Sequence, residues 1–69
     1  MTASIRVNGE TRAWRGETVA ELLRGLGLDP ARPGLAIALN GRIVRRSRWG
    51  EQAIAAGDDI DIVRATQGG

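Results

Sequence analysis

Short stretches of the chain alternate apolar with polar or small residues, which is the pattern of half-buried β-strands. They predict strands over residues 4–7, 11–14, 35–39, 42–44 and 59–63. Asn8-Gly9 and Asn40-Gly41 separate consecutive strands of this set. Both residue types tolerate positive φ, so each pair predicts a tight β-hairpin. The pattern therefore predicts two hairpins and a separate last strand.

One segment has helical periodicity instead. Apolar residues recur at i, i+3, i+4 and i+7, on one face of a helix, at Val19, Leu22, Leu23 and Leu26. Thr18 and Glu21 have the spacing of a capping box, which predicts the helix start. Gly27 suits the left-handed position that ends a helix. Residues 45–56 show no clear period, and we expect one short helical turn near residues 49–53.

The predicted order is hairpin, helix, hairpin, strand. One helix with one apolar face requires one sheet face to cover. Parallel pairing of the first and last strands then gives an α+β domain of the β-grasp type, with a mixed sheet of four to five strands. We expect the domain to span residues 1–64 and residues 65–69 to form a flexible tail, because that segment has little apolar surface to bury.

Composition excludes several classes of site. The chain of 69 residues contains no cysteine and no histidine, so disulfides and a histidine or cysteine catalytic triad cannot be built. No apolar run approaches the ~20 residues of a membrane span, and no basic-apolar signal segment is present. We expect a cytoplasmic protein with no membrane partner.

Charge does not favour nucleic-acid binding. All ten basic residues are arginine, yet the formal net charge is only +2. Arg45, Arg46 and Arg48 form the one cluster, which we interpret as a solvated strand end. Trp14 and Trp49 are the only aromatic residues, which is a poor supply for base stacking. We expect both tryptophans at the edges of the core and assign neither to a partner.

The sequence ends in Gly68-Gly69. Neither residue has a Cβ, so this end can thread a channel too narrow for any side chain. Its carboxylate is sterically open and ionised at neutral pH, since an α-carboxyl group titrates near pH ~3.5. Five or six residues beyond the last strand, at ~3.3 Å each, reach roughly 16–20 Å. That length suffices to enter another protein's buried active site.

The order of these motifs resembles a known family. An early Val7-Asn8-Gly9 is followed by the helix start at residues 18–23, the segment 36–44, Gly57-Asp58 and the final Gln67-Gly68-Gly69. Together they resemble the ThiS-like sulfur carriers of thiamine biosynthesis, within the ubiquitin-like β-grasp proteins. Arg45 departs from the family pattern, where proline is expected; this concerns a strand end and not the tail.

The resemblance implies a function in which the chain is a carrier and not an enzyme. A ubiquitin-activating-type adenylyltransferase would use ATP and Mg²⁺ to adenylate Gly69, with no cofactor bound by the carrier itself. A sulfur donor such as a cysteine desulfurase relay would convert Gly69 to a thiocarboxylate, and thiazole synthase would take the sulfur. Gly68 and Gly69 would enter the partner active sites.

Two further groups of residues are candidates for binding. Asp58, Asp59 and Asp61 have too few acidic neighbours for a calcium site and are interpreted as a solvated strand face. Val63 is expected on the sheet face opposite the helix, because Ile60 and Ile62 are expected to face it. Ala36 and Ala38 would share the Val63 face and form a small apolar patch for partner docking.

Three alternatives stay open from the residues alone. The chain is also compatible with a sulfur carrier for molybdopterin or another sulfur-transfer pathway, because the tail chemistry is identical. It is compatible with a β-grasp interaction module whose tail is inert. An RNA-binding module is the third alternative, and a steep salt dependence of binding would identify it.

Overall fold

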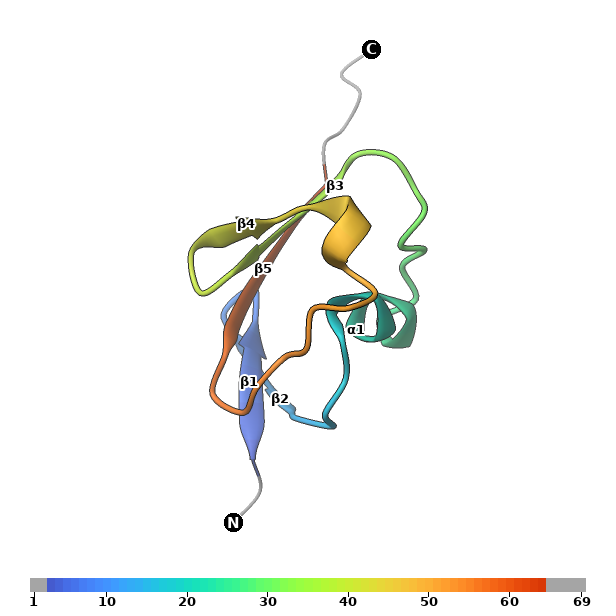
Figure 1. Ribbon diagram of the computed structural model, residues 1–69. Coiled ribbons are helices and arrows are strands. Elements are labelled where there is room, and N and C mark those ends of the chain that lie inside the picture. The colour runs from blue at the N-terminus through green and yellow to red at the C-terminus, as the bar shows by residue number, and fades with distance from the viewer. Residues whose placement is uncertain (1–2, 65–69) are drawn as a thin grey trace.

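A five-stranded sheet carries one α-helix on one face (Figure 1) in the computed structural model, which describes residues 3–64. The elements are β1 (Ser4–Val7), β2 (Glu10–Ala13), α1 (Val19–Gly25), β3 (Leu35–Leu39), β4 (Arg42–Val44), the 3-10 helix η1 (Arg46–Arg48) and β5 (Asp59–Arg64). The strand order is β2-β1-β5-β3-β4. β1 and β5 are parallel and the other pairs are antiparallel. The predicted β-grasp fold with a mixed sheet is confirmed.

Both predicted hairpins form at the Asn-Gly pairs. Asn8 and Asn40 each have φ of 51°, and Gly9 and Gly41 each have φ of 83°. Positive φ at both central residues matches the right-handed twist of the flanking strands. β2 covers Glu10–Ala13, one residue earlier than the predicted 11–14, because Glu10 pairs with Val7 directly across the turn.

The two turn asparagines also bind the central strand. The Asn8 side-chain Oδ1 accepts a hydrogen bond from the Ile62 N–H at 2.7 Å. The Asn40 Oδ1 accepts one from the Asp59 N–H at 2.9 Å. Asn8 and Asn40 each lie one residue beyond the end of a strand that pairs with β5, namely β1 and β3. Their side-chain amides therefore accept hydrogen bonds from backbone N–H groups of β5. The hairpin signal alone did not predict this second role.

Two substitutions at Asn8 separate its two roles. We expect Asn8→Gly to lower the free energy of unfolding by about 1 kcal/mol, because only the hydrogen bond to Ile62 is lost. Asn8→Ala should cost about 2–3 kcal/mol, because alanine also has to adopt the left-handed conformation. Urea denaturation of both variants measures the difference. An alanine variant as stable as the glycine variant would contradict this account.

Helix α1 begins and ends at the predicted residues. Thr18 Oγ1 accepts from the Glu21 N–H, and Glu21 Oε1 accepts from the Thr18 N–H, which completes the capping box. After α1, Gly27 has φ of +79° and donates to the Arg24 carbonyl. The Leu28 N–H donates to the Leu23 carbonyl at 2.8 Å. These two bonds form a Schellman motif, which satisfies the last carbonyls of the helix.

The core lies between α1 and the sheet. Ile5, Val7, Ile37 and Ile60 line the sheet side, and each is at most 5% exposed. Ile62 is partly buried against the same cluster, so β5 presents Ile60 and Ile62 to the helix side as predicted. The other buried apolar residues are Val19, Ala20, Leu22, Leu23, Leu35, Trp49 and Ile54.

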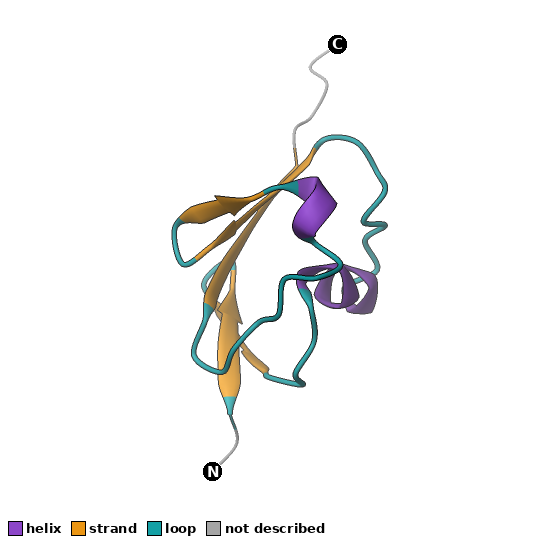
Figure 2. Cartoon of the chain, in the orientation of Figure 1, coloured by secondary structure: helices purple, strands orange, loops and turns teal. Residues whose placement is uncertain are grey.

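The segment between β4 and β5 corrects two predictions and adds one buried residue. The helical turn is η1 at Arg46–Arg48, not near residues 49–53 (Figure 2). Trp49 is not at the edge of the core; its side chain is 3% exposed and its Nε1 donates to the Val44 carbonyl at 2.8 Å. Ile54 is 2% exposed, although the residues around it show no helical or strand periodicity that would predict its burial. A buried indole needs a hydrogen-bond acceptor, and the end of β4 supplies it.

This segment also completes the start of α1. The Val19 N–H donates to the Gln52 carbonyl at 2.9 Å, and the Ala20 N–H donates to the Trp49 carbonyl at 3.0 Å. The first N–H groups of a helix have no partner inside the helix. A non-periodic loop therefore supplies acceptors that the helix cannot supply, which explains why residues 49–52 are ordered against it.

Candidate functional site

The predicted apolar patch lies on the sheet face opposite α1. Val63 on β5 is 58% exposed and is paired in register with Ala36 on β3, which is also exposed. Ala38, two residues further along β3, is half-buried and pairs with Asp61. The structure therefore brings Val63, Ala36 and Ala38 together on one face.

Ile43 is the largest apolar residue on this face and was not predicted as part of it. It pairs with Ala38 across the β3–β4 hairpin and its side chain is 75% exposed. We call Ala36, Ala38, Ile43 and Val63 the outer-face patch. The register that follows from the Asn40-Gly41 turn already places Ile43 opposite Ala38, so this signal was present in the sequence.

Acidic residues border the outer-face patch along β5. Asp61 and Asp59 are exposed, and Asp61 lies opposite Ala38. Asp58 has a structural role instead: its Oδ2 accepts from the Ala55 N–H at 2.8 Å and its Oδ1 accepts from the Asn40 side chain at 3.0 Å. Within residues 3–64, no group of three or more acidic side chains is placed to hold a metal ion.

The end of β5 is the part of the described structure that leads to the predicted tail. β5 ends at Arg64, which pairs with Leu35 at the start of β3. β1 ends at Val7, opposite Ile60, so residues 63–64 extend beyond the β1–β2 hairpin. Gly68 and Gly69 lie outside the described residues, and the prediction of a flexible tail over residues 65–69 lies there too.

Arg46 is not only a solvated side chain at a strand end, which corrects the interpretation of the arginine cluster. Its Nη1 donates to the Pro30 carbonyl, and its Nη2 lies 3.4 Å from the Leu35 carbonyl. Its guanidinium carbon lies 4.5 Å from the centre of the Trp49 ring. A planar guanidinium can donate hydrogen bonds and stack on an aromatic ring together. Arg46 therefore joins η1 to the loop before β3, beside the end of β5.

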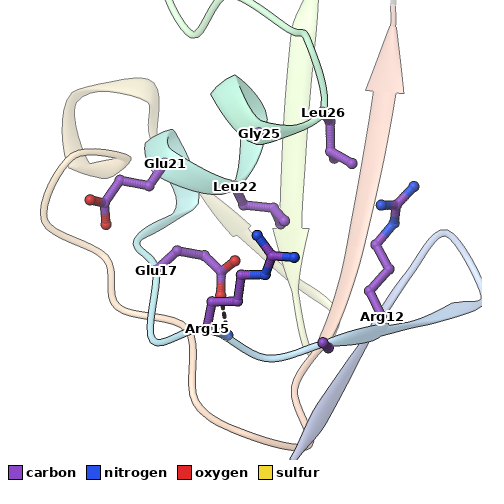
Figure 3. Close-up of a pocket in the computed structure, with 8 residues that line it drawn as sticks. Arg12, Arg15, Glu17, Glu21, Leu22, Gly25 and Leu26 are labelled. Carbon is purple, nitrogen blue, oxygen red and sulfur yellow. Dashed lines mark hydrogen bonds between the residues drawn. The ribbon is translucent and has the colours of Figure 1, made fainter.

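A groove of about 240 Å³ lies between β2 and α1 (Figure 3). Leu22 and Leu26 lie at its base, and Arg12 and Arg15 face the helix from the other side. Glu17 accepts from the Arg15 N–H at 3.0 Å, and Glu21 is held in the capping box. Both carboxylates thus stabilise the turn into α1. Because these two carboxylates are already hydrogen-bonded to the backbone, the polar side chains of the groove do not converge on a common point where a substrate could bind.

Trp14 is also accounted for by the structure. It is 37% exposed and its Nε1 donates to the Ile54 carbonyl at 2.6 Å. The indole therefore fastens the end of β2 to the segment before β5, at the edge of the core as predicted. None of the helices in the described part of the chain is long and apolar enough to cross a membrane.

Fold and surface together define a class of protein. The chain is a ubiquitin-like β-grasp domain with a central last strand and a sheet face that carries exposed apolar residues. The chain belongs to the ThiS family, whose family model matches residues 5–69. The match includes Gly68 and Gly69 and confirms the resemblance seen in the sequence.

Curated and structural relatives agree with this family. The chain is 39% identical over 54 residues to the sulfur carrier protein ThiS of Escherichia coli (strain K12), covering 78% of this chain and 79% of that protein. A crystal structure of the thiamine biosynthesis protein ThiS from Geobacter metallireducens matches with a TM-score of 0.77 and 26% identity, covering 96% of this chain and 99% of the other. A solution structure of a thiamine biosynthesis protein from the same organism gives a TM-score of 0.74 at 26% identity, over 96% and 87%.

Proposed function

We propose that the protein is a sulfur carrier in thiamine biosynthesis and that Gly69 is the residue that carries the sulfur. The observation that supports this most strongly is the ThiS family match, which runs through residues 5–69 and so includes the Gly-Gly pair. The protein is a carrier and not a catalyst. Its part in the chemistry is to present one reactive carboxyl group to enzymes that bind it.

The proposed chemistry has three steps on the Gly69 carboxyl group. Carboxylate is a poor acyl donor, so attack on the α-phosphate of ATP first forms an acyl-adenylate and releases pyrophosphate. A persulfide donor then displaces AMP, and cleavage of the resulting sulfur–sulfur bond by a thiol leaves the thiocarboxylate. The thiocarboxylate is nucleophilic, and sulfur held in this form is not lost as free sulfide.

Three partners follow from this chemistry. A ubiquitin-activating-type adenylyltransferase would supply ATP and Mg²⁺, a cysteine desulfurase relay would supply the persulfide, and thiazole synthase would accept the sulfur. The need for ATP favours the cytoplasm as the site of action. The chain's own contribution is geometric: β5 is the central strand, held on both sides over part of its length, and it leads directly to the tail.

A carrier for molybdopterin or another sulfur pathway would use the same tail chemistry. The curated relative and the two solved relatives are named for the ThiS or thiamine pathway, which favours thiazole formation. Reconstitution with purified adenylyltransferase, desulfurase and thiazole synthase tests the proposal. Thiocarboxylate formation without thiazole formation would move the protein to another sulfur pathway, and no adenylation at all would favour the inert interaction module.

We further propose that the outer-face patch docks the adenylyltransferase. We expect Val63→Asp and Ile43→Asp each to slow ATP–pyrophosphate exchange by about 10-fold or more, because a carboxylate buried without a partner is costly. Thermal melting should change little, since exposed substitutions usually alter stability by within ~0.5 kcal/mol.

Thr11→Asp is the matched control for this patch. Thr11 pairs with Arg6 and so lies on the same sheet face, but over β2 and away from Val63 and Ile43. The control introduces the same charge, and ATP–pyrophosphate exchange with this variant should proceed at the wild-type rate. If Val63→Asp and Ile43→Asp melt normally and also exchange at the wild-type rate, the patch does not dock this enzyme.

A further inference from the structure

A second surface, which shares only Ile43 with the outer-face patch, lies along the free edge of β4. It is an open groove of about 690 Å³ between β4 and the segment that contains η1. Leu39 and Val44 contribute apolar surface to it, and Arg42, Arg45 and Arg48 contribute charge. No aspartate or glutamate is among its lining residues. The groove is therefore apolar and cationic together.

Two of these arginines have no carboxylate partner among residues 3–64. The ion pair found in residues 3–64 joins Arg48 Nε to Glu51 Oε2 at 3.8 Å, between side chains that are 67% and 73% exposed. An exposed pair of this kind contributes little and exchanges readily. Arg42 and Arg45 are exposed and form no ion pair in the described part of the chain. Their guanidinium groups are thus available to an incoming carboxylate.

The backbone of β4 also presents hydrogen-bonding groups along the groove. β4 is an edge strand, and its pairing with β3 places Leu39 opposite Arg42 and Ala38 opposite Ile43. In a hairpin closed by a two-residue turn, the residues flanking the turn share the first hydrogen bonds. The next residue, Ile43, then points its N–H and C=O away from β3. An unpaired edge of this kind is a template for another strand.

We propose that this groove binds an extended acidic segment of a protein partner. The segment's backbone pairs with Ile43, an aliphatic side chain rests on Leu39 and Val44, and its carboxylates meet Arg42 and Arg45. Arg42 is the register partner of Leu39 and so lies on the same sheet face as Leu39 and Val44. Successive side chains of a strand point to opposite faces, so the segment needs an aliphatic and an acidic residue two positions apart. This binding goes beyond the proposed function, because the chemistry of Gly69 does not require it.

The aromatic residues favour a peptide over RNA. Binding of single-stranded nucleic acid relies on bases stacked on aromatic rings as well as on positive charge. Trp49 is 3% exposed with its Nε1 bound to Val44, and Trp14 is fastened to Ile54. Neither indole lines the groove. An acidic peptide can contact both the arginines and the apolar side chains of Leu39 and Val44, whereas RNA would contact only the arginines.

The probe is a short blocked peptide in which pairs of valines alternate with pairs of glutamates, so that each face of the strand carries both residue types. We expect it to bind the folded protein at low salt and to shift the amide resonances of Ile43, Arg45 and Gln52. The same peptide with glutamine in place of the glutamates should bind about 10-fold more weakly or worse. Equal binding of the two peptides, or shifts centred on β2 and α1 instead, would overturn the proposal.

Charge reversal locates the binding site. We expect Arg42→Glu with Arg45→Glu to weaken binding of the acidic peptide by about 10-fold or more, and a peptide with lysine in place of the acids to bind this variant. Arg24→Glu with Arg32→Glu changes the net charge equally, away from the groove, and should leave binding within about 3-fold. Equal loss in both double variants would overturn the proposal, as would a uridine oligonucleotide that binds tighter and displaces the peptide. None of these readouts depends on Gly69.

Discussion

Removing Gly69, or adding one alanine after it, is expected to abolish thiocarboxylate formation. Each change moves the terminal carboxylate by one residue, about 3.3 Å along an extended chain. Misplacing a reacting group by even ~1 Å can cost about 100-fold in rate, so we expect a loss of at least that size in ATP–pyrophosphate exchange. Intact-mass spectrometry of the reconstituted reaction then shows no product in which sulfur replaces oxygen.

The matched control for Gly69 is Thr66→Ala. It alters the tail by one small side chain and keeps both its length and the Gly-Gly pair. We expect this variant to be adenylated and thiocarboxylated at close to the wild-type level, with an unchanged melting curve in all three proteins. A thiocarboxylate on the shortened or extended chain would show that Gly69 does not carry the sulfur.

The largest expected effect on stability comes from Ile60→Asp. Ile60 is 0% exposed on the central strand, paired with Val7 on one side and Leu39 on the other. Deleting a buried aliphatic side chain costs about 2–5 kcal/mol, and an unpaired buried carboxyl group adds several more. A chain of this length has a total stability of only about 3–10 kcal/mol. We therefore expect Ile60→Asp to be unfolded at 25 °C by circular dichroism.

Val63→Asp is the control on the same strand. Val63 also has a β-branched side chain, but it lies on the outer face and is 58% exposed. Its melting should stay near that of the wild type, and Ile62→Asp should fall between the two because Ile62 is only partly buried. A cooperative wild-type melt for Ile60→Asp would mean that the two faces of the sheet have been assigned the wrong way round.

Local patterns in the sequence predicted most of the fold. The Thr18–Glu21 capping box, the Gly27 stop signal and the two Asn-Gly turns each depend on residues within a few positions of one another. Period-2 alternation then assigned Ile60 and Val63 to opposite faces. These signals survive because the backbone geometry of a turn, a helix end or a strand is set by its own residues. Their agreement on a single β-grasp arrangement is typical of a sequence that specifies one fold.

The candidate site was predicted less completely. Val63, Ala36 and Ala38 were placed on one face from alternation alone, and the structure locates them there. Ile43 was missed because its strand has only three residues, too few to show a period, although the hairpin register was available. Gly68 and Gly69 were singled out by chemistry and by family resemblance, and the described residues do not extend to them.

The sequence by itself determined the elements, the turns and the faces of the strands. The tertiary structure decided the role of residues 45–56, which show no period because their buried side chains contact different parts of the fold. Trp49 can be buried because β4 offers it an acceptor, and Arg46 is held by the carbonyls of Pro30 and of Leu35 at the start of β3. The Asn8–Ile62 bond joins residues 54 positions apart. Contacts of that range depend on how the whole chain closes, and no local pattern encodes them.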